Sequence, residues 1–438
     1  MDFERGKPRG FCCAFQSVFI VVAGLSCWPS SGASALTLDR VIAQAEMANA
    51  TLRSAQATLS AAVGEQIESR APLWNNPVVG SELLRRSIRS TGEGPAARND
   101  WALSVSQTFE TGGQPRARRD VAEQNFHAVD ERIRDLRLQI RAEAEQRFVQ
   151  ILSIQERVEM ETRLQQIAQD AAAMVAKRVS VGEDSKLDGN VARVEAERAK
   201  NQLAALQEQR HKSRAELAKS LQVALSDLPD LIGNLESSHS YTLEALLESA
   251  AKKPAARMLD AKEQMAASRL ALERAVRYPD VTVGMSRERD TGISERTVIS
   301  TLSVSLPLPL FRRNQAGIGR AQTELAQARV EREAGQLNAR NEVLSLWQRS
   351  ENLQLRWRRL VDEVLPRLAE NERLSVTSYR VGEISLAQLL LVQRQVLDGR
   401  RDALDAQTEM RLTQIELEMA AGWHAASLSD TGATGRQR

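Results

Sequence analysis

The two halves of this 438-residue chain repeat the same short segments in the same order. Leu103–Ser106 is identical to Leu302–Ser305, and Val181–Glu183 is identical to Val381–Glu383. Five such matches occur at offsets between 199 and 205 residues, the others being Thr37-Leu38-Asp39 with Thr242-Leu243-Glu244, Arg70-Ala71 with Arg274-Ala275, and Val79-Gly80 with Val283-Gly284. The matches include strand and turn segments, so the general similarity of helical sequences does not explain them. They predict one structural unit that occurs twice.

Each unit is predicted to be a helix, a β-hairpin and a very long helix that folds back on itself. Within each unit, Gly-, Pro- and Asn-bearing stretches separate segments of period two from segments of helical period. We expect a first repeat at 36–225 (strands about 78–88 and 101–109, tip 181–185), a linker at 226–240, a second repeat at 241–423 (strands about 281–288 and 298–306, tip 381–385) and a polar tail at 424–438. Polar loops are expected at 89–99 and 289–295.

The second strand of each unit alternates apolar and small polar residues. Trp101, Leu103, Val105 and Phe109 would lie on one face of the sheet, with Ala102, Ser104, Ser106 and Thr108 on the other. A strand of a soluble sandwich has the same alternation, but the length fits the roughly 9–11 residues of a tilted membrane-spanning strand.

Four such strands cannot close a barrel by themselves, because even small bacterial barrels need about eight. Open strand edges are excluded from lipid, where their N–H and C=O groups would have no partner. Several copies must therefore pool their strands. Two copies give a barrel filled by side chains, and three give twelve strands with room for a lumen.

The helix expected from Arg116 to Ser180 would be about 100 Å long at ~1.5 Å per residue, too long for one globular core. Its apolar stripe has a mean spacing near 3.7 residues, which is typical of a nearly straight helix; the stripe comprises Val129, Ile133, Leu136, Ile140, Ala144, Phe148 and Ile151. Gly182 and Gly382 are expected to end the long helices, with Ser185 and Ser385 capping the next. Pro366 should kink the second long helix, and Gly335 is a weaker expected interruption.

The first 35 residues have the pattern of a secretory signal peptide. Three basic residues precede an apolar stretch from Phe11 to about Cys27, and Ala33-Ser34-Ala35 is a small-x-small cleavage site. A membrane anchor is the alternative, although the apolar run falls short of the ~20 residues of a span. All three cysteines lie in this segment, so the processed chain would have no disulfide and no thiolate metal site. Lipidation of Cys27 is a further variant.

The sequence lacks the patterns of an enzyme. Its four histidines are not paired at metal-ligand spacing, and there is no Gly-rich phosphate loop. A formal net charge of +2 does not indicate a nucleic-acid-binding surface. We therefore predict no catalytic residues, no cofactor and no resident metal site.

Several segments together resemble the TolC-type outer-membrane efflux family over essentially the whole processed chain: Leu36–Asp39, Val364–Glu370, Tyr379–Ser385 and Leu389–Gln393. The resemblance implies a mainly α fold with a small β part. Two tandem helix–β-hairpin–long-helix repeats would form one third of a trimeric α-barrel plus a twelve-stranded β-barrel. The homotrimer would sit in the outer membrane of a Gram-negative bacterium, with its helices in the periplasm. Its partners would be a periplasmic adaptor (a membrane fusion protein) and an inner-membrane pump of the RND type.

In this family the hairpin tips are where the adaptor docks and where the channel constricts. The resemblance places docking at Val181, Gly182, Glu183 and Ser185 and at Val381, Gly382, Glu383 and Ser385. The family also tends to carry acidic rings just past the tips. Asp188 matches such a position, whereas Gln388 and Leu391 occupy the corresponding places of the second half. Asp188 is equally well explained as an exposed acid in the first turn of a helix.

The strand-to-helix junction Ser106–Arg116, followed by Arg118-Arg119, resembles the cobalt–zinc–cadmium branch of the family, which serves heavy-metal efflux. Alternatively, this junction serves only the geometry of the barrel. The resemblance therefore implies a passive duct for heavy-metal cations. Drug or organic-solute efflux and type I secretion are the alternatives with the same architecture, and a periplasmic helical adaptor or scaffold is a more distant one.

Overall fold

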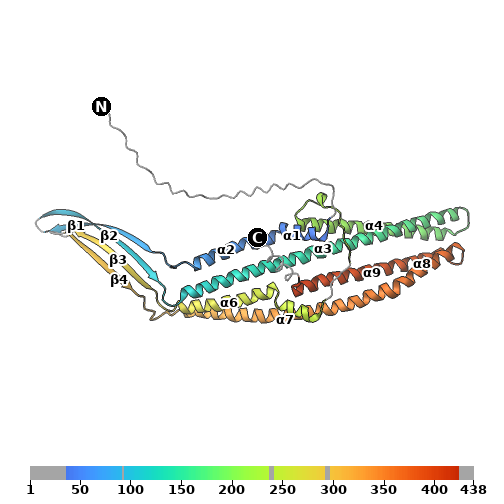
Figure 1. The fold of residues 1–438 in the computed structure, drawn as a ribbon. Helices are drawn as coiled ribbons and strands as arrows, with labels where there is room; N and C mark the ends of the chain where they lie inside the picture. Colours follow the sequence, from blue (N-terminus) through green and yellow to red (C-terminus); the bar gives the residue numbers. More distant parts are fainter. Residues whose placement is uncertain (1–35, 91–92, 236–240, 292–295, 424–438) are drawn as a thin grey trace, which may run out of the picture.

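The computed structural model describes residues 36–90, 93–235, 241–291 and 296–423. These residues form a long molecule with a four-stranded sheet at one end and two helical hairpins reaching to the other (Figure 1). The predicted signal peptide, 1–35, and the predicted tail, 424–438, lie outside the described residues. None of the described helices is both long enough and apolar enough to cross a membrane.

The elements follow each other in the same order in both halves, as the repeat predicts. The first half contains α1 (Leu38–Ala48), α2 (Ala50–Ser69), β1 (Val78–Ser90), β2 (Glu93–Phe109), α3 (Gln114–Ser180) and α4 (Lys186–Leu221). The second contains α5 (Leu243–Ala251), α6 (Pro254–Ala275), β3 (Val281–Thr291), β4 (Arg296–Ser305), α7 (Gln315–Arg359), α8 (Leu365–Arg380) and α9 (Leu386–Ala421). A short 3₁₀ turn, η1 (Leu225–Asp227), and a π-helical segment, η2 (Leu360–Val364), complete the order.

The strands pair antiparallel in the order β1-β2-β3-β4 and are longer than predicted. The polar loop expected at 89–99 is wrong, because β1 continues to Ser90, β2 begins at Glu93, and pairs such as Arg86 with Arg98 extend the ladder. Likewise β3 runs to Thr291, inside the second predicted loop, while 292–295 lie outside the described residues. Polar side chains signalled a loop, but the backbone pairs whichever side chains it carries.

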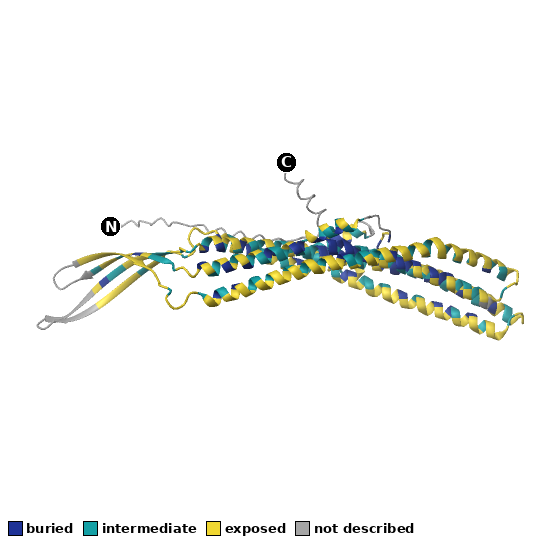
Figure 2. Cartoon of the chain, turned by 90° about the horizontal axis from the view of Figure 1, so that it is seen from below, coloured by how far each residue is buried: buried dark blue, intermediate teal, exposed yellow. Residues whose placement is uncertain are grey.

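The register confirms that the sheet has one apolar and one small polar face. Neighbours across the four strands on the apolar face are Val79, Val105, Met285 and Leu302. One residue along, the opposite face carries Gly80, Ser104, Ser286 and Thr301. The apolar side chains are uncovered within the chain, with Leu302 75 % and Val79 72 % exposed. Figure 2 shows the sheet mostly in the colour of exposed residues. In water such a face would be unfavourable, so it needs an apolar environment.

The main core lies midway along the helices (Figure 2). All seven residues of the predicted stripe on α3 belong to it or pack against it, which confirms that prediction. The inter-repeat linker contributes Leu228, Leu231 and Leu235, all 5 % exposed or less. The linker is held to the chain start by the bridge between Leu36 and Leu231, in which the Leu36 N–H donates to the Asp230 carbonyl at 2.9 Å. The linker is therefore part of the core.

The second long helix changes geometry beside its proline, as predicted. Pro366 sits in the first turn of α8, immediately after the π-helical segment η2. Proline has no N–H to donate to the carbonyl four residues back, so the preceding turn widens. The expected interruption at Gly335 is wrong, because α7 runs through it. A Cβ at Gly335 would lie 2.5 Å from Leu259 Cδ1, so this glycine permits close packing of α7 on α6.

A row of polar contacts joins the two repeats where α3 runs antiparallel to α9. Arg401 pairs with Glu161, whose residue exposure is 0 %, and Arg411 pairs with Glu145. Between them, the Arg157 guanidinium lies 3.3 Å from the Asp405 carboxylate and the Thr408 hydroxyl donates to Ser153 Oγ at 2.8 Å. We call these eight residues the α3–α9 ladder. Moving α3 along α9 would separate the buried carboxylates of Glu145 and Glu161 from their arginines, so the ladder fixes the register of the hairpins.

The ladder predicts that Glu161→Ala lowers the free energy of unfolding by about 3 kcal/mol, because the buried partner that joins Arg401 to α3 is removed and Arg401 keeps only Asp398 of its own helix. Circular dichroism during urea unfolding measures this. Glu195→Ala is the control, since Glu195 pairs with Arg198 on the exposed surface and should cost less than about 1 kcal/mol. Equal losses in the two variants would show that the ladder does not hold the hairpins together.

The strand-to-helix junction yields a second prediction. A Cβ at Gly112 would lie 2.5 Å from the Ala275 carbonyl oxygen and 2.9 Å from Tyr278 Cβ, so Gly112→Ala should displace the junction backbone and reduce the yield of assembled protein several-fold. Gly64→Ala is the control, because nothing lies within 4 Å of a Cβ there and helical Gly→Ala stabilises by roughly 1 kcal/mol. Gel migration of the purified oligomer measures both. A normal yield of the Gly112 variant would contradict the assignment.

Candidate functional site at the hairpin tips

The two predicted tips lie at the same end of the molecule, opposite the sheet (Figure 1). One tip connects α3 to α4 and the other connects α8 to α9. Val181, Gly182, Glu183 and Ser185 lie in the first turn, and Val381, Gly382, Glu383 and Ser385 lie in the second. The fold thus brings together two segments that are 200 residues apart in the sequence.

The first tip ends α3 with a left-handed glycine. Gly182 has φ +82°, and its N–H donates to the Val179 carbonyl at 3.2 Å. The Glu183 N–H then reaches back to the Arg178 carbonyl at 2.9 Å. These two hydrogen bonds are those of a Schellman turn, which satisfies the last carbonyls of a helix and sends the chain back in the opposite direction.

The second tip repeats this geometry bond for bond. Gly382 has φ +79°, its N–H donates to the Tyr379 carbonyl at 3.1 Å, and the Glu383 N–H donates to the Ser378 carbonyl at 2.9 Å. An L-residue other than Asn or Asp is strained at such a φ, so glycine is required for conformation at both tips. Neither glycine would have an atom within 4 Å of an added Cβ, so packing imposes no such requirement.

Residues 188 and 388 have matching roles as the third helical residue after each tip. The Asp188 N–H donates to Ser185 Oγ at 3.1 Å, and the Ser185 hydroxyl donates to the Asp188 carboxylate at 2.6 Å. At the second tip Ser385 and Gln388 form a full capping box. Asp188 is therefore an exposed acid in the first turn of α4, as the alternative explanation expected, and its carboxylate also contacts the capping serine. An acid or an amide can cap in this way, which explains why the repeat conserves the geometry and changes the charge.

The tips present exposed apolar and acidic side chains and no reactive group. Val181 is 69 % exposed and Val381 67 %. The Glu183 carboxylate lies 3.6 Å from Arg178, whereas the Glu383 carboxylate accepts from the Ser378 hydroxyl at 3.0 Å. The two tips therefore share a shape and differ in the charge beside it. Such a surface can contact another protein.

Leu391, the third candidate gate residue, lies about two turns into α9 rather than in the turn itself. It is 57 % exposed and lines a hollow of about 440 Å³ between α3, α4 and α9. Glu161 and Arg401 of the ladder line the same hollow. Leu391 thus lies one helical turn beyond Gln388 on α9, whereas Asp188 and Gln388 belong to the caps.

Sequence reasoning did not find the α3–α9 ladder. Its only signal was that Glu145 lies beside Ala144 and Phe148, within the apolar stripe of α3.

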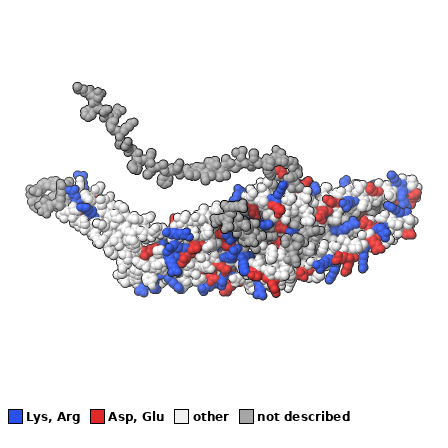
Figure 3. All heavy atoms as spheres, in the orientation of Figure 1, with Lys and Arg blue, Asp and Glu red and all other residues white. Residues whose placement is uncertain are grey.

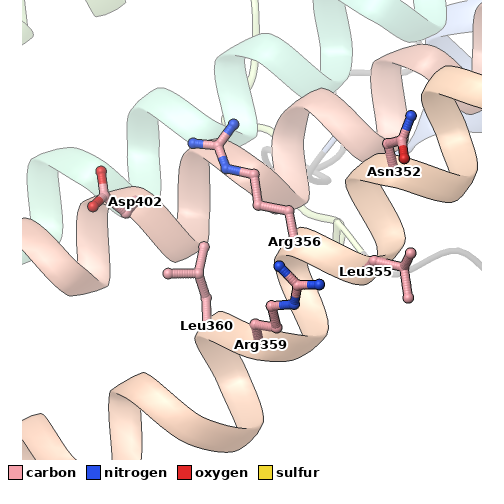
Figure 4. A pocket seen from close by; sticks show the side chains of 6 residues that line it. All are labelled: Asn352, Leu355, Arg356, Arg359, Leu360 and Asp402. Carbon is pink, nitrogen blue, oxygen red and sulfur yellow. The ribbon is translucent and has the colours of Figure 1, made fainter.

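A second feature that sequence reasoning did not find is a hollow of about 360 Å³ beside the π-helical segment (Figure 4). Asn352, Leu355, Arg356, Arg359, Leu360 and Asp402 line it. It contains no predicted site residue, and Arg356 lies 3.5 Å from Glu409. Within the described ranges no group of three or more His, Cys, Asp or Glu could hold a metal ion.

Comparison with known proteins agrees with this architecture. A family model described as "Outer membrane efflux protein" matches residues 41–222 and 246–423, one stretch in each repeat. The cobalt-zinc-cadmium resistance protein CzcC of Cupriavidus metallidurans is 27 % identical over 414 residues, which are 90 % of this chain and 93 % of that protein. The nickel-cobalt-cadmium resistance protein NccC of Alcaligenes xylosoxydans xylosoxydans is 25 % identical and covers 68 % of this chain and 67 % of its own length.

Among solved structures, the outer membrane protein VceC of Vibrio cholerae superposes with a TM-score of 0.73. The match covers 88 % of this chain and 96 % of that one at 17 % identity, so it shows a common fold. The tandem-repeat channel fold and the resemblance to this family are thereby confirmed. Because one family model accounts for both repeats, this protein belongs to the outer membrane efflux protein family, whose members are trimeric outer-membrane channels of efflux systems.

Proposed function

We propose that this channel is the exit duct for heavy-metal cations in a three-part efflux system. The observation that carries the proposal is the similarity to a cobalt-zinc-cadmium resistance protein along 90 % of this chain. A second similarity, to a nickel-cobalt-cadmium resistance protein, supports the same class of substrate. Both names concern divalent transition-metal ions, so the proposed substrate is such an ion.

The duct is passive, and its energy comes from partner proteins. The sheet's apolar face suits lipid, and its opposite face of Gly, Ser and Thr suits a water-filled lumen. The hairpins extend from the membrane into the periplasm, where the tips meet a periplasmic adaptor. An inner-membrane pump of the RND type supplies the ion. A duct needs only weak contacts along its length, because an ion held tightly would not leave.

The two tips are the proposed docking surface, through Val181, Gly182, Glu183 and Ser185 and their counterparts Val381, Gly382, Glu383 and Ser385. Their matched Schellman turns would present six projections of the same backbone shape per trimer, two from each chain. Asp188, Gln388 and Leu391 are the proposed gate positions. Asp188 and Gln388 are exposed directly after the turns, and Leu391 is an exposed apolar residue further into the helix.

The substrate proposal predicts that a strain without this gene becomes sensitive to divalent metals. The deletion strain should lose growth at zinc, cobalt, cadmium or nickel concentrations about tenfold below those the parent tolerates, and the cloned gene should restore tolerance. Growth curves across a metal series and a drug series measure this. Sensitivity to drugs or organic solutes with unchanged metal tolerance would replace the metal substrate while keeping the duct.

The docking proposal predicts that Gly182→Pro and Gly382→Pro impair metal export although trimers still form. Proline fixes φ near −65° and removes the N–H that closes the turn, so the tip changes shape far from the sheet and core. Metal tolerance in cells measures export, and gel migration measures the trimer.

Gly182→Asn and Gly382→Asn are the matched controls, because asparagine tolerates positive φ and keeps the N–H. They should retain most of the export activity. Full export by the proline variants would show that the tips do not dock a partner. Loss of export in the asparagine variants as well would indicate that the partner requires a position without a side chain at the tip.

A further inference from the structure

The chain contains one complete interface between its repeats and the two separate sides of a second one. In the sheet, β2 of the first repeat pairs with β3 of the second, and α3 packs on α6 next to them. By element order β4 and α7 are the counterparts of β2 and α3, while β1 and α2 are those of β3 and α6. β1 and β4 each have a partner on one side only. The two edges of the chain therefore correspond to the two sides of an interface that exists within it.

The repeat converts the internal register into a register between copies. β4 follows β2 at an offset of 199 residues through four identical residues, and β3 follows β1 at an offset of 204. Within the chain, Ser106 of β2 pairs with Gly284 of β3. The same pairing between copies places Ser305 of β4 opposite Gly80 of the neighbouring copy in the trimer, which we call the next copy.

This register agrees with the two faces of the sheet. It places Leu302 opposite Leu83 of the next copy, both on the apolar face, and Ser303 opposite Glu82, both on the other face. A shift by one residue would mix the faces. Figure 3 shows few charged side chains on the part of the sheet nearest the helices, so little charge would have to be desolvated between copies there.

The register also gives an acceptable strand tilt. The row that begins at Gly80 runs through Ser104, Ser286 and Thr301 and then reaches Leu84 of the next copy. Height along the strand thus changes by four residues over four strands. With ~3.3 Å per residue and ~4.8 Å between strands, the tilt is about 35°, which lies within the range of closed barrels.

The two matched glycines show which neighbour is missing at the edge. Gly284 is buried, and a Cβ there would lie 2.6 Å from Ser303 Oγ on one side and 3.6 Å from Ser106 Cβ on the other. Gly80 is half-buried, and a Cβ there would lie 2.6 Å from Ser104 Oγ, with no other described atom within 4 Å. The counterpart of the missing neighbour is Ser305, which the register supplies from the next copy.

The first residue of the helix after each hairpin repeats this difference. Gln114 begins α3 and Gln315 begins α7, and each accepts a hydrogen bond from the N–H two residues earlier, at 2.7 Å and 3.2 Å. Gln114 is 2 % exposed, and its Nε2 donates to the Asp280 carboxylate of the other repeat at 3.1 Å. Gln315 is exposed. Asn76 precedes Asp280 by 204 residues and offers an amide oxygen at the β1 edge.

The connector from β4 to α7 is apolar and two residues longer than its counterpart, because the offset rises from 199 at the strands to 201 at the helix starts. In it, Leu308 is 67 % and Phe311 92 % exposed. Trp74, just before β1, is 48 % exposed and has the Arg118 guanidinium 3.7 Å from its ring centre. With either offset, Phe311 falls opposite the segment of the next copy that contains Trp74.

We propose that β4, its connector and the start of α7 dock on the β1 edge of the next copy in the register of the internal interface. Ser305 then lies opposite Gly80, Gln315 donates to the Asn76 side chain, and Phe311 covers the exposed part of Trp74. This assigns the residues that join the copies where the sheet meets the helices. It does not rest on the substrate that the channel transports.

Disulfide cross-linking in outer membranes tests the register. Leu302→Cys with Leu83→Cys, and Ser303→Cys with Glu82→Cys, place two cysteines directly opposite each other between copies. Successive pairs of an antiparallel ladder alternate in spacing, so the two double variants include one closer pair. Oxidation should give covalent dimers and trimers on a denaturing gel without reductant. Leu302→Cys alone accounts for any reaction of the native cysteines.

Pairs two residues out of register are the matched controls: Leu302→Cys with Arg85→Cys, and Ser303→Cys with Leu84→Cys. Their Cβ atoms would lie about 7–8 Å apart, beyond the ~3.5–4.5 Å of a disulfide, so they should cross-link at least about tenfold more slowly. Faster cross-linking of a shifted pair, or none in either in-register variant, would overturn the register.

The lifetime of the purified trimer in sodium dodecyl sulfate tests the contact at Asn76. Asn76→Ala should shorten it about fivefold, a typical effect of one lost hydrogen bond. Asn76→Asp keeps an acceptor and recreates the pairing of Gln114 with Asp280, so it should keep the lifetime of the parent. An unchanged lifetime of the alanine variant, or equal losses in both variants, would overturn this contact.

The same measurement distinguishes a second copy from lipid as the partner of the connector. Phe311→Ala should shorten the trimer lifetime at least about tenfold, because a large apolar side chain leaves the interface. Leu187→Ala is the control, since Leu187 is 71 % exposed on α4 at the end of the molecule opposite the sheet (Figure 1). If lipid covers the connector, Phe311→Ala leaves the lifetime unchanged and the proposed contact is wrong. Export is not measured, so another substrate would not alter these results.

Discussion

The free edges of the four-stranded sheet are the constraint on which the rest of the structure depends. β1 and β4 each have a partner on one side only, and the apolar face of the sheet is uncovered within the chain. In lipid an unpaired N–H or C=O costs several kcal/mol, so the edges must meet strands of other copies. The trimeric channel of this family is one solution to that requirement. The sheet of one chain is thus one segment of the channel's β-sheet.

The long helix α3 connects the sheet to the first tip and contacts elements of both repeats. On one side its apolar stripe packs with α1, α4 and the inter-repeat linker. Towards α9 it presents the buried acids of the ladder, whose arginines come from the other repeat. Apolar packing supplies most of the stabilisation, whereas the ion pairs select one register of α3 against α9. A one-turn slip would keep much apolar contact and leave Glu161 and Glu145 without partners.

The duplicated turns show what repetition conserves and what it leaves free to change. Both tips keep a left-handed glycine and a serine cap, because the backbone conformation depends on them. At the third helical position, the charged Asp188 completes one cap and the neutral Gln388 completes the other. A duplicated fold can therefore carry an asymmetric charge distribution at one end without a change of shape. Selection on a partner or on an ion can act there.

Sequence alone determined the repeat, the order of its elements, the two faces of the sheet and the turns at Gly182 and Gly382. These features follow from local rules: strand side chains alternate, helices bury one stripe, and glycine adopts positive φ. Sequence misjudged the strand ends near Ser90 and Glu93 and the helix through Gly335, because ladder pairing and close packing override local composition. Only the tertiary structure decided that Glu161 meets Arg401 and that the linker enters the core. Each depends on segments far apart in the chain, whose register no local pattern specifies.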